Sequence, residues 1–181
     1  MGTEPERTGR APDAVLVCGL IAAGSAAADA ATSLLEASYG PILLASPRVP
    51  FTWTRFYAAE MGDELVRQFV AFERAFYPGL LVETKRATCE MERAHARDGK
   101  RTFNLDPGYM TLSTLVVAST KEASYRVYLG AGTYAQPMLV FRDKRFHPFE
   151  WTYPDYGDPA HLEFFTAVRR LARERGILAP R

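Results

Sequence analysis

The sequence predicts an α+β fold, with helices alternating with strands in the first half and antiparallel strands dominating the second. Over residues 14–105, apolar runs of strand length alternate with helix-forming segments in the order β-α-β-β-α-β. Over residues 125–149, short alternating segments separated by turn residues are typical of a meander. Residues 158–176 carry a helical stripe. We therefore expect a ferredoxin-like β-α-β-β-α-β core extended by an antiparallel β-meander and a C-terminal helix.

Composition restricts both the class of protein and its partners. A chain of 181 residues is long enough for one sizeable core and too short for two ordinary domains. Its 22 Lys and Arg against 21 Asp and Glu give a formal charge of +1, so we expect no binding to duplex DNA. Residues 1–12 are polar and match neither a signal peptide nor a membrane span. We expect a disordered leader over 1–12 and one cytoplasmic globular domain over 13–181, with no membrane partner.

The first elements are predicted from the pattern of apolar residues and from the residues that begin and end helices. Ala14–Ile21 is a continuous apolar run, which predicts a central strand covered on both faces. Ser25 is placed to cap an alanine-rich helix that stops at Tyr39-Gly-Pro41. Ile42–Ala45 is a second strand, followed by an irregular loop in which prolines alternate with aromatics. That loop, residues 50–57, either covers the sheet edge or forms a stacking wall for a ligand.

The middle of the chain contains one segment with two possible structures, followed by a helix and a turn signal. Residues 65–73 fit a strand by alternation and a helix by a stripe of aromatics, and we choose the strand because aromatic and β-branched residues are frequent. Residues 80–97 predict a helix that stops at Asp98-Gly99. Residues 101–105 predict a strand, and Asp106-Pro-Gly108 predicts the turn that ends it.

The remaining elements complete the meander and the last helix. Residues 112–118 are a short buried helix or strand, and the segments 125–129, 134–141 and 146–149 are strands of the meander. Asp158 caps the final helix, with Pro159 at its first position. The expected buried stripe of this helix consists of Leu162, Phe165, Val168 and Leu171. Cys18 and Cys89 are expected to be free thiols.

Polar side chains gather around the predicted Asp-Pro-Gly turn. The two candidate catalytic residues are Asp106 and Lys121. Asp106 is a general base, a metal ligand, or the first residue of its own turn, and Asn104 projects to the same side of the strand. The three histidines show no spacing for zinc, so we predict no protein metal site. A magnesium ion held mainly through ligand phosphates is compatible with these residues.

Four cations border apolar segments, where they are costly to desolvate without a partner. They are Lys85, Arg101, Lys121 and Arg126. Either all four converge on one anion site, or Arg101 and Lys121 merely pair with Glu73, Glu83 or Asp106. The aromatic segment Trp151–Tyr156 offers a second choice, because its rings either stack on a planar ligand or form a lid over the core.

These residues predict a small-molecule enzyme or binding protein for a phosphorylated metabolite or nucleotide. The candidate ligand-binding residues are Lys85, Arg101, Asn104, Tyr109, Ser119, Arg126 and Tyr134. The alternative is a noncatalytic interaction module in which the aromatic segments bind single-stranded RNA or a protein partner. The sequence fixes neither the reaction nor the oligomeric state.

Several segments together resemble one bacterial and archaeal family. They are Phe51–Tyr57, Glu60–Gly62, Phe69–Glu73, Asn104–Tyr109, Ala118–Lys121, Arg126–Gly130, Gly132–Tyr134 and Trp151–Tyr156. In this combination the chain resembles the family called domain of unknown function 4416, over nearly its whole length after the leader. The resemblance implies a single cytoplasmic domain and carries no established reaction.

Overall fold

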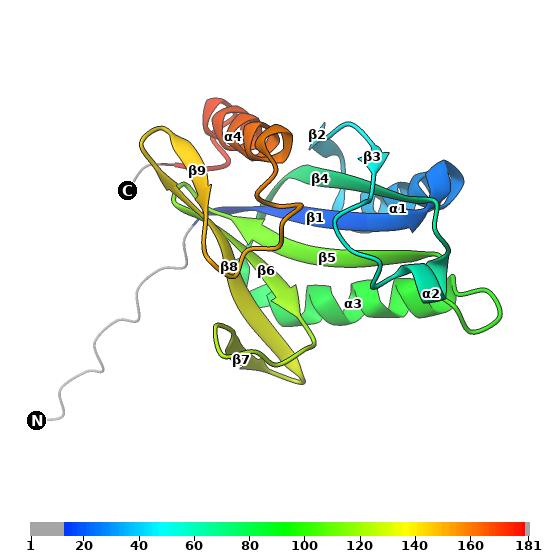
Figure 1. Ribbon diagram of the computed structural model, residues 1–181. Helices are drawn as coiled ribbons and strands as arrows, with labels where there is room; N and C mark the ends of the chain where they lie inside the picture. Colours follow the sequence, from blue (N-terminus) through cyan, green and yellow to red (C-terminus); the bar gives the residue numbers. More distant parts are fainter. Residues whose placement is uncertain (1–12, 180–181) are drawn as a thin grey trace, which may run out of the picture.

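The computed structural model describes residues 13–179, and the predicted leader, residues 1–12, lies outside them (Figure 1). Within the described residues the fold is α+β, with a nine-stranded antiparallel sheet of order β2-β4-β1-β5-β6-β8-β7, to which β3 adds beside β4 and β9 beside β8. The strands are β1 (Ala14–Ala23), β2 (Ile42–Ala45), β3 (Val49–Pro50), β4 (Leu65–Phe76), β5 (Phe103–Met110), β6 (Thr114–Ser119), β7 (Val127–Gly130), β8 (Thr133–Arg142) and β9 (Arg145–Pro148). The helices are α1 (Gly24–Tyr39), α2 (Ala58–Met61), α3 (Leu81–Ala94) and α4 (Pro159–Glu174).

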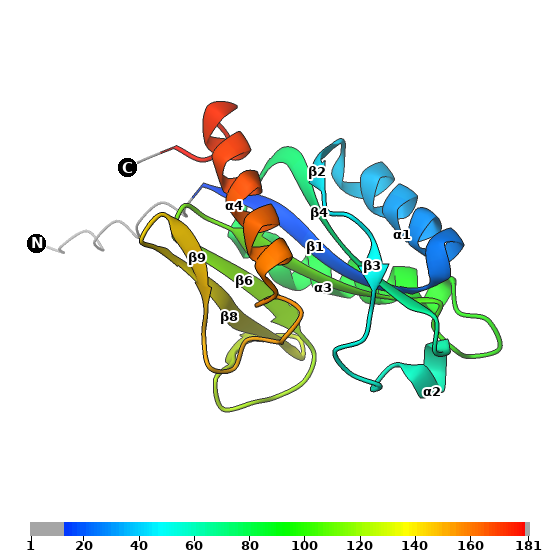
Figure 2. The ribbon, with the colours of Figure 1, turned by 45° about the horizontal axis from the view of Figure 1, so that its top comes forward.

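Helices cover both faces of the sheet, and β1 alternates between the two resulting cores. On one face, Leu16 and Leu20 of β1 pack with Leu35 of α1 in a cluster that Met91 of α3 also contacts. On the other face, Val15 and Val17 belong to the cluster that contains the buried side of α4. Figure 2 shows α4 crossing one face while α3 lies behind the sheet. The predicted central strand covered on both faces is confirmed.

The ambiguous segment over residues 65–73 is a strand, as predicted. It belongs to β4, which pairs antiparallel with β1 from Leu65 to Phe76 and with β2 on its other side. The residues from Arg67 to Phe72 are buried, because both faces of this strand are covered. The segment over residues 112–118 was left open between helix and strand; from Thr114 onward it belongs to the strand β6, while residues 112–113 precede it.

The predicted turn at Asp106-Pro-Gly is wrong, because all three residues lie inside β5. Pro107 pairs in register with Cys18 of β1. A proline inside a strand is tolerated where no ladder hydrogen bond is needed, and β5 pairs with β6 only from Gly108 onward. Gly108 is required for close approach, because an added Cβ would overlap the carbonyl oxygen of Val116. Pro107 therefore lies where the edge of β5 is not paired with β6, and Gly108 lies where the two strands approach each other closely.

Helix α3 occupies the free edge of β5. Glu92 Oε1 accepts a hydrogen bond from the Leu105 amide at 2.6 Å, and Lys85 Nζ donates to the Leu105 carbonyl at 2.8 Å. Two side chains thus satisfy backbone groups that a neighbouring strand would otherwise pair. In Figure 1, α3 runs alongside β5 where β6 diverges from it. This contact brings Lys85 to the edge of the sheet beside Asp106.

Two helix ends differ from the prediction. Helix α1 begins at Gly24 with no side-chain cap, so Ser25 does not perform the expected capping. Helix α3 ends at Ala94. Asp98 and Gly99 both have positive φ and lie between Arg97 and Lys100, which form a β-bridge with each other. Those residues therefore form a hairpin turn beyond the helix.

The C-terminal helix begins as predicted. Asp158 accepts a hydrogen bond from the Ala160 amide at 2.9 Å, and Pro159 is the first helical residue. Phe165 and Val168 are buried as expected, whereas Leu162 and Leu171 are half-buried. The rest of the buried face is supplied by His161, Phe164 and Ala172.

Cys18 and Cys89 are free thiols. None of the described helices combines the length and apolarity needed to cross a membrane.

Candidate functional site

Two aromatic loops enclose a cavity of about 330 Å³ at one end of the sheet. One loop connects β3 to α2 and the other connects β9 to α4, and Figure 2 shows them side by side. We call this space the aromatic cavity. Its lining residues are Ile21, Phe51, Trp53, Thr54, Phe56, Tyr57, Arg67, Asp106, Lys121, Tyr153, Pro154 and Asp155.

The loop after β3 packs over the end of the sheet, and its rings also line the aromatic cavity. Phe51 is buried with Ile21 and contacts the rings of Trp53 and Tyr57 at centroid distances of 5.7 and 6.0 Å. This packing covers the end of the sheet, while the rings also line the cavity. Phe56 is 62% exposed, with the Lys121 ammonium 4.0 Å from its ring centroid. The aromatic wall therefore ends in a cation at the rim.

Arg67 is the most unusual residue of the cavity lining, because a guanidinium is rarely so deeply buried. Its side chain is 1% exposed, and Nη2 pairs with Asp155 Oδ2 at 2.8 Å. Burial lowers the pKa of Arg67, but the charge of Asp155 and other nearby groups raises this pKa above its usual value. Nε and Nη1 form no hydrogen bond of normal geometry with the described residues, although the Tyr156 hydroxyl, which is unpaired itself, lies close enough to help raise the pKa of Arg67. Such buried donors are ordinarily satisfied, and an oxygen of water or of a ligand would satisfy them here.

Gly19 of β1 makes room for the Arg67 guanidinium. A Cβ added to Gly19 would lie 2.8 Å from the Tyr156 hydroxyl and 2.9 Å from Arg67 Nη2. The guanidinium also lies 4.1 Å from the ring centroid of Phe69. Arg67 is thus held between a ring, a carboxylate and a bare stretch of backbone, which restricts its conformations before any ligand binds.

Asp106 is the second carboxylate of the cavity lining, and hydrogen bonds from two side chains fix its orientation. Asn104 Nδ2 donates to Oδ2 at 2.9 Å, and Lys85 Nζ lies 3.4 Å from Oδ1. Burial lowers the pKa of Lys85, but the charges of Asp106 and Glu92 raise it above its usual value. Lys85 is therefore an ammonium. Asp106 keeps acceptor capacity for a ligand because a carboxylate has about four lone-pair sites.

Arg101 lies outside the cavity and positions Asn104, which in turn orients Asp106. Its Nη1 donates to Asn104 Oδ1 at 2.8 Å, and two of its other nitrogens bind Glu60 at 2.8 and 2.7 Å. These hydrogen bonds hold the pKa of Glu60 below its usual value. Glu92 Oε2 lies 3.3 Å from Arg101 as well. Arg101 is therefore neutralised by two carboxylates and positions Asn104.

Arg126 joins two segments of the cavity wall. It donates to the Tyr153 hydroxyl at 2.5 Å, to the Lys121 carbonyl at 2.5 Å and to Gln136 Oε1 at 2.8 Å. Ser119 Oγ accepts a hydrogen bond from the Lys121 amide at 3.1 Å. Arg126 and Ser119 therefore support Lys121 and do not line the cavity themselves.

The four predicted cations do not line one common cavity. Lys121 alone of the four is part of the lining, while Lys85 pairs with Asp106 and Arg101 pairs with Glu60 and Glu92. Tyr109 packs with Leu81 of α3, and Tyr134 contacts Tyr128 at a centroid distance of 5.2 Å. Both of these tyrosines lie outside the aromatic cavity. The described residues contain no group of His, Cys, Asp and Glu able to hold a metal ion.

The segment Trp151–Tyr156 divides its rings between packing and the cavity. Trp151 lies parallel to Tyr125 and Phe149 at centroid distances of 5.7 and 5.1 Å, which makes it part of a stacked lid. Tyr153 and Asp155 line the cavity. Sequence reasoning missed Asp155, Gly19 and Arg67. The available signal was an arginine that lies between Leu65 and Phe69, the apolar residues on the same face of the predicted strand.

A family model matches residues 12–171, a range that contains every residue lining the aromatic cavity. The chain belongs to the family described as Domain of unknown function (DUF4416). The predicted family is confirmed. No match was found among curated proteins or among solved structures. The cavity of this DUF4416 protein is therefore interpreted from its own geometry.

Proposed function

We propose that this DUF4416 protein binds a phosphorylated metabolite or nucleotide in the aromatic cavity. The observation that carries the proposal is the buried guanidinium of Arg67, whose Nε and Nη1 form no hydrogen bond of normal geometry with the described residues. Oxygen atoms of an anionic ligand are the natural acceptors for a guanidinium. Lys121 at the rim adds a second positive charge.

Size and lining support a ligand with a planar ring. The cavity of about 330 Å³ lies at the lower end of the range of roughly 300–1,000 Å³ for small-molecule sites. Phe51, Trp53, Phe56, Tyr57 and Tyr153 supply the apolar part of its lining. Stacking of a base on an aromatic side chain contributes about 1–3 kcal/mol. A nucleotide or a similar phosphorylated ring compound combines both features.

Asp106 gives the proposed site a group that can act on its ligand. Its carboxylate lines the cavity, is 20% exposed and is oriented by Asn104 and Lys85. In an enzyme it would accept a proton from the ligand, while Lys121 would neutralise a phosphate oxygen. A magnesium ion would bind mainly through the phosphates, with Asp106 as its protein ligand.

The arrangement of elements around the cavity supports a ferredoxin-like unit as its frame. The strands β2-β4-β1-β5 are neighbours in this order, and α1 and α3 pack on one face of them. We assign the meander β6–β9 and α4 as extensions of this unit. In this assignment, the cavity forms where loops of the unit and of the extension meet, in a protein of the cytoplasm.

Ligand-induced stabilisation tests the proposal. Thermal-shift measurements with nucleotides and sugar phosphates, with and without magnesium, should raise the Tm for at least one class of compound. In calorimetry, Lys121→Gln should then weaken binding of that compound about tenfold, because one charge-assisted hydrogen bond is lost. Lys100→Gln, an exposed lysine in the α3–β5 connection, is the matched control and should bind as the wild type does. Equal affinities for all three proteins would refute the site.

A noncatalytic RNA-binding module is the alternative, and exposed Phe56 beside Lys121 favours it. In that case single-stranded RNA should bind with an affinity that falls steeply with salt, and Phe56→Ala should reduce it. Nucleotides should then cause no thermal shift. The two functions therefore give opposite results in the same pair of assays.

A further inference from the structure

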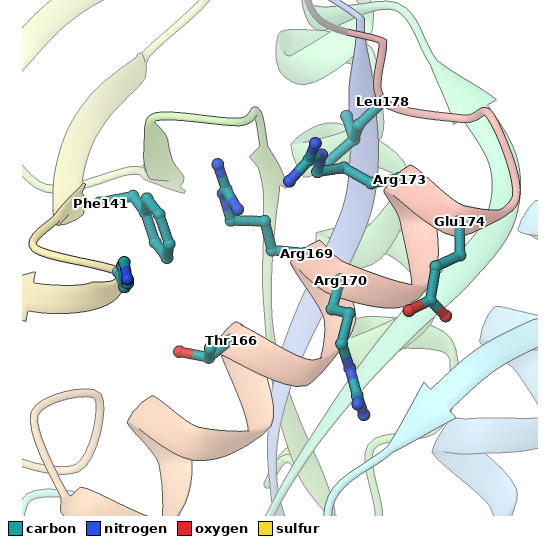
Figure 3. Close-up of a pocket in the computed structure, with 8 residues that line it drawn as sticks. Phe141, Thr166, Arg169, Arg170, Arg173, Glu174 and Leu178 are labelled. Atoms are coloured by element: carbon teal, nitrogen blue, oxygen red, sulfur yellow. The ribbon is translucent and has the colours of Figure 1, made fainter.

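A hollow of about 650 Å³ lies between α4 and the β8–β9 hairpin, away from the aromatic cavity (Figure 3). We call it the basic trough. Its lining residues are Phe141, Lys144, Thr166, Arg169, Arg170, Arg173, Glu174 and Leu178. Figure 3 shows the side chains of Arg169 and Arg173 extending from α4 to the same side. None of the trough residues lines the aromatic cavity.

Positive charge is concentrated around the basic trough. Residues 142–145 and 159–174, which form the hairpin turn and α4, contain six Lys and Arg and three Asp and Glu, whereas the whole chain has a formal charge of +1. Within residues 13–179, the three arginines of the lining form no salt bridge with a carboxylate. The surface therefore attracts anions.

Arg169 is fixed in place before any ligand arrives. Its Nε donates to the Leu112 carbonyl at 2.7 Å, and its guanidinium lies 3.6 Å from the ring centroid of Phe141. Both contacts leave Nη1 and Nη2 without a hydrogen-bond partner among the described residues. A guanidinium held in this way loses less conformational entropy when it binds an anion.

Like charges in the trough repel each other. Arg169 and Arg173 are four residues apart on α4, a spacing at which like charges destabilise a helix. Burial lowers the pKa of Arg169, and the charge of Arg173 lowers it further. An anion bound between the two guanidinium groups would remove this repulsion.

We propose that the basic trough binds a soluble anion that carries two or more phosphate groups. Arginine binds phosphate through paired, nearly parallel hydrogen bonds, and the trough presents three arginines and Lys144. A single phosphate would leave much of this charge uncompensated. The volume of about 650 Å³ also exceeds the need of one phosphate group.

Calorimetry with inorganic tripolyphosphate and the full chain tests the proposal. The wild type should bind it at low ionic strength, and the double variant Arg170→Gln/Arg173→Gln should bind at least about tenfold more weakly, because two charged donors are lost. The control is Arg86→Gln/Arg93→Gln, which removes the same charge from exposed positions of α3. Its affinity should change by less than about twofold, because α3 and α4 lie on opposite faces of the sheet.

Three results would overturn the proposal. The first is a wild type that does not bind tripolyphosphate, even if Arg170 and Arg173 prove necessary for binding to anionic vesicles. The second is an equal loss of affinity in both double variants, which would indicate nonspecific attraction. The third is binding that is lost in Lys121→Gln but kept in Arg170→Gln/Arg173→Gln. That result would show that the anion binds in the aromatic cavity. It would support the proposed function and refute anion binding in the basic trough.

Discussion

Gly19→Ala tests whether the space around Arg67 is as restricted as the structure indicates. Alanine in the middle of an ordinary strand is about 0.5–1 kcal/mol more favourable than glycine. At position 19, however, the new Cβ would lie 2.8 Å from the Tyr156 hydroxyl and 2.9 Å from Arg67 Nη2. Both are terminal atoms, but both side chains are fully buried and Asp155 fixes the guanidinium. They cannot move aside without breaking that ion pair or displacing a packed ring.

The expected effect is therefore a loss of stability where a gain would be usual. Overpacking costs about 1–3 kcal/mol, so after the gain from replacing glycine we expect a net loss of about 1–2 kcal/mol. For a chain of this length, such a loss lowers the Tm by about 2–8 °C. Urea denaturation of Gly19→Ala and of the wild type measures the difference directly. Thermal melts provide an independent check.

A matched control and a second variant isolate the cause. At Gly157 an added Cβ would meet its nearest atom at 3.6 Å, so Gly157→Ala should be neutral or slightly stabilising. Tyr156→Phe removes the nearer of the two clashing atoms, so adding it to Gly19→Ala should recover at least about 0.5 kcal/mol as coupling energy. If Gly19→Ala is as stable as Gly157→Ala, Arg67 has room to move, and our account of a preorganised guanidinium is refuted.

Three further variants test the core, the pairing of Asp106 with Lys85, and the pH dependence of stability. Phe165→Ala, at a fully buried position of α4, should lose about 3–5 kcal/mol in urea denaturation, and a loss below about 1 kcal/mol would show that this face is not the core. Asp106→Asn leaves the buried Lys85 ammonium without its nearest carboxylate, so we expect a loss of about 1–3 kcal/mol in urea denaturation; an unchanged stability would contradict the pairing. Hydrogen bonds from Arg101 lower the pKa of Glu60 below 4.5, so its contribution is present above pH 4.5 and lost as the pH falls through the lowered pKa. Glu60→Gln should flatten stability measured between about pH 3 and 6, and a profile parallel to the wild type would argue against this ion pair.

Elements determined by local pattern could be predicted from the sequence. The continuous apolar run of β1 required cover on both faces, and the cap at Asp158 with Pro159 set the start of α4. The buried face of α4 was predicted only in part. His161 is buried against Trp53 of the loop after β3, whose ring centroid is 5.7 Å away, and Phe164 is buried against Phe69 of β4, whose ring centroid is 6.2 Å away. Periodicity within one helix carries no information about such neighbours.

The site was harder to predict because its charges are paired across long sequence separations. Arg67 meets Asp155, and Arg101 meets Glu60, through contacts that only the folded sheet creates. The sequence did indicate Asp106 and Lys121, and both line the aromatic cavity. It could not indicate which cations are already neutralised. For that reason, of the four cations that were expected to converge, Lys121 is the one that lines the aromatic cavity, at its rim.

The Asp106-Pro-Gly segment shows how one local signal can serve a different purpose from the usual one. Pro107 has no amide hydrogen to offer a neighbouring strand, and Lys85 and Glu92 already bind the backbone of Leu105. Strand β6 therefore pairs with β5 only beyond this point, where Gly108 permits close contact. The resulting divergence leaves the Asp106 side chain within reach of both Lys85 and the aromatic cavity. A turn at these residues would have ended β5 before it reached β6, and the aromatic cavity would have lost the strand that positions its acidic group.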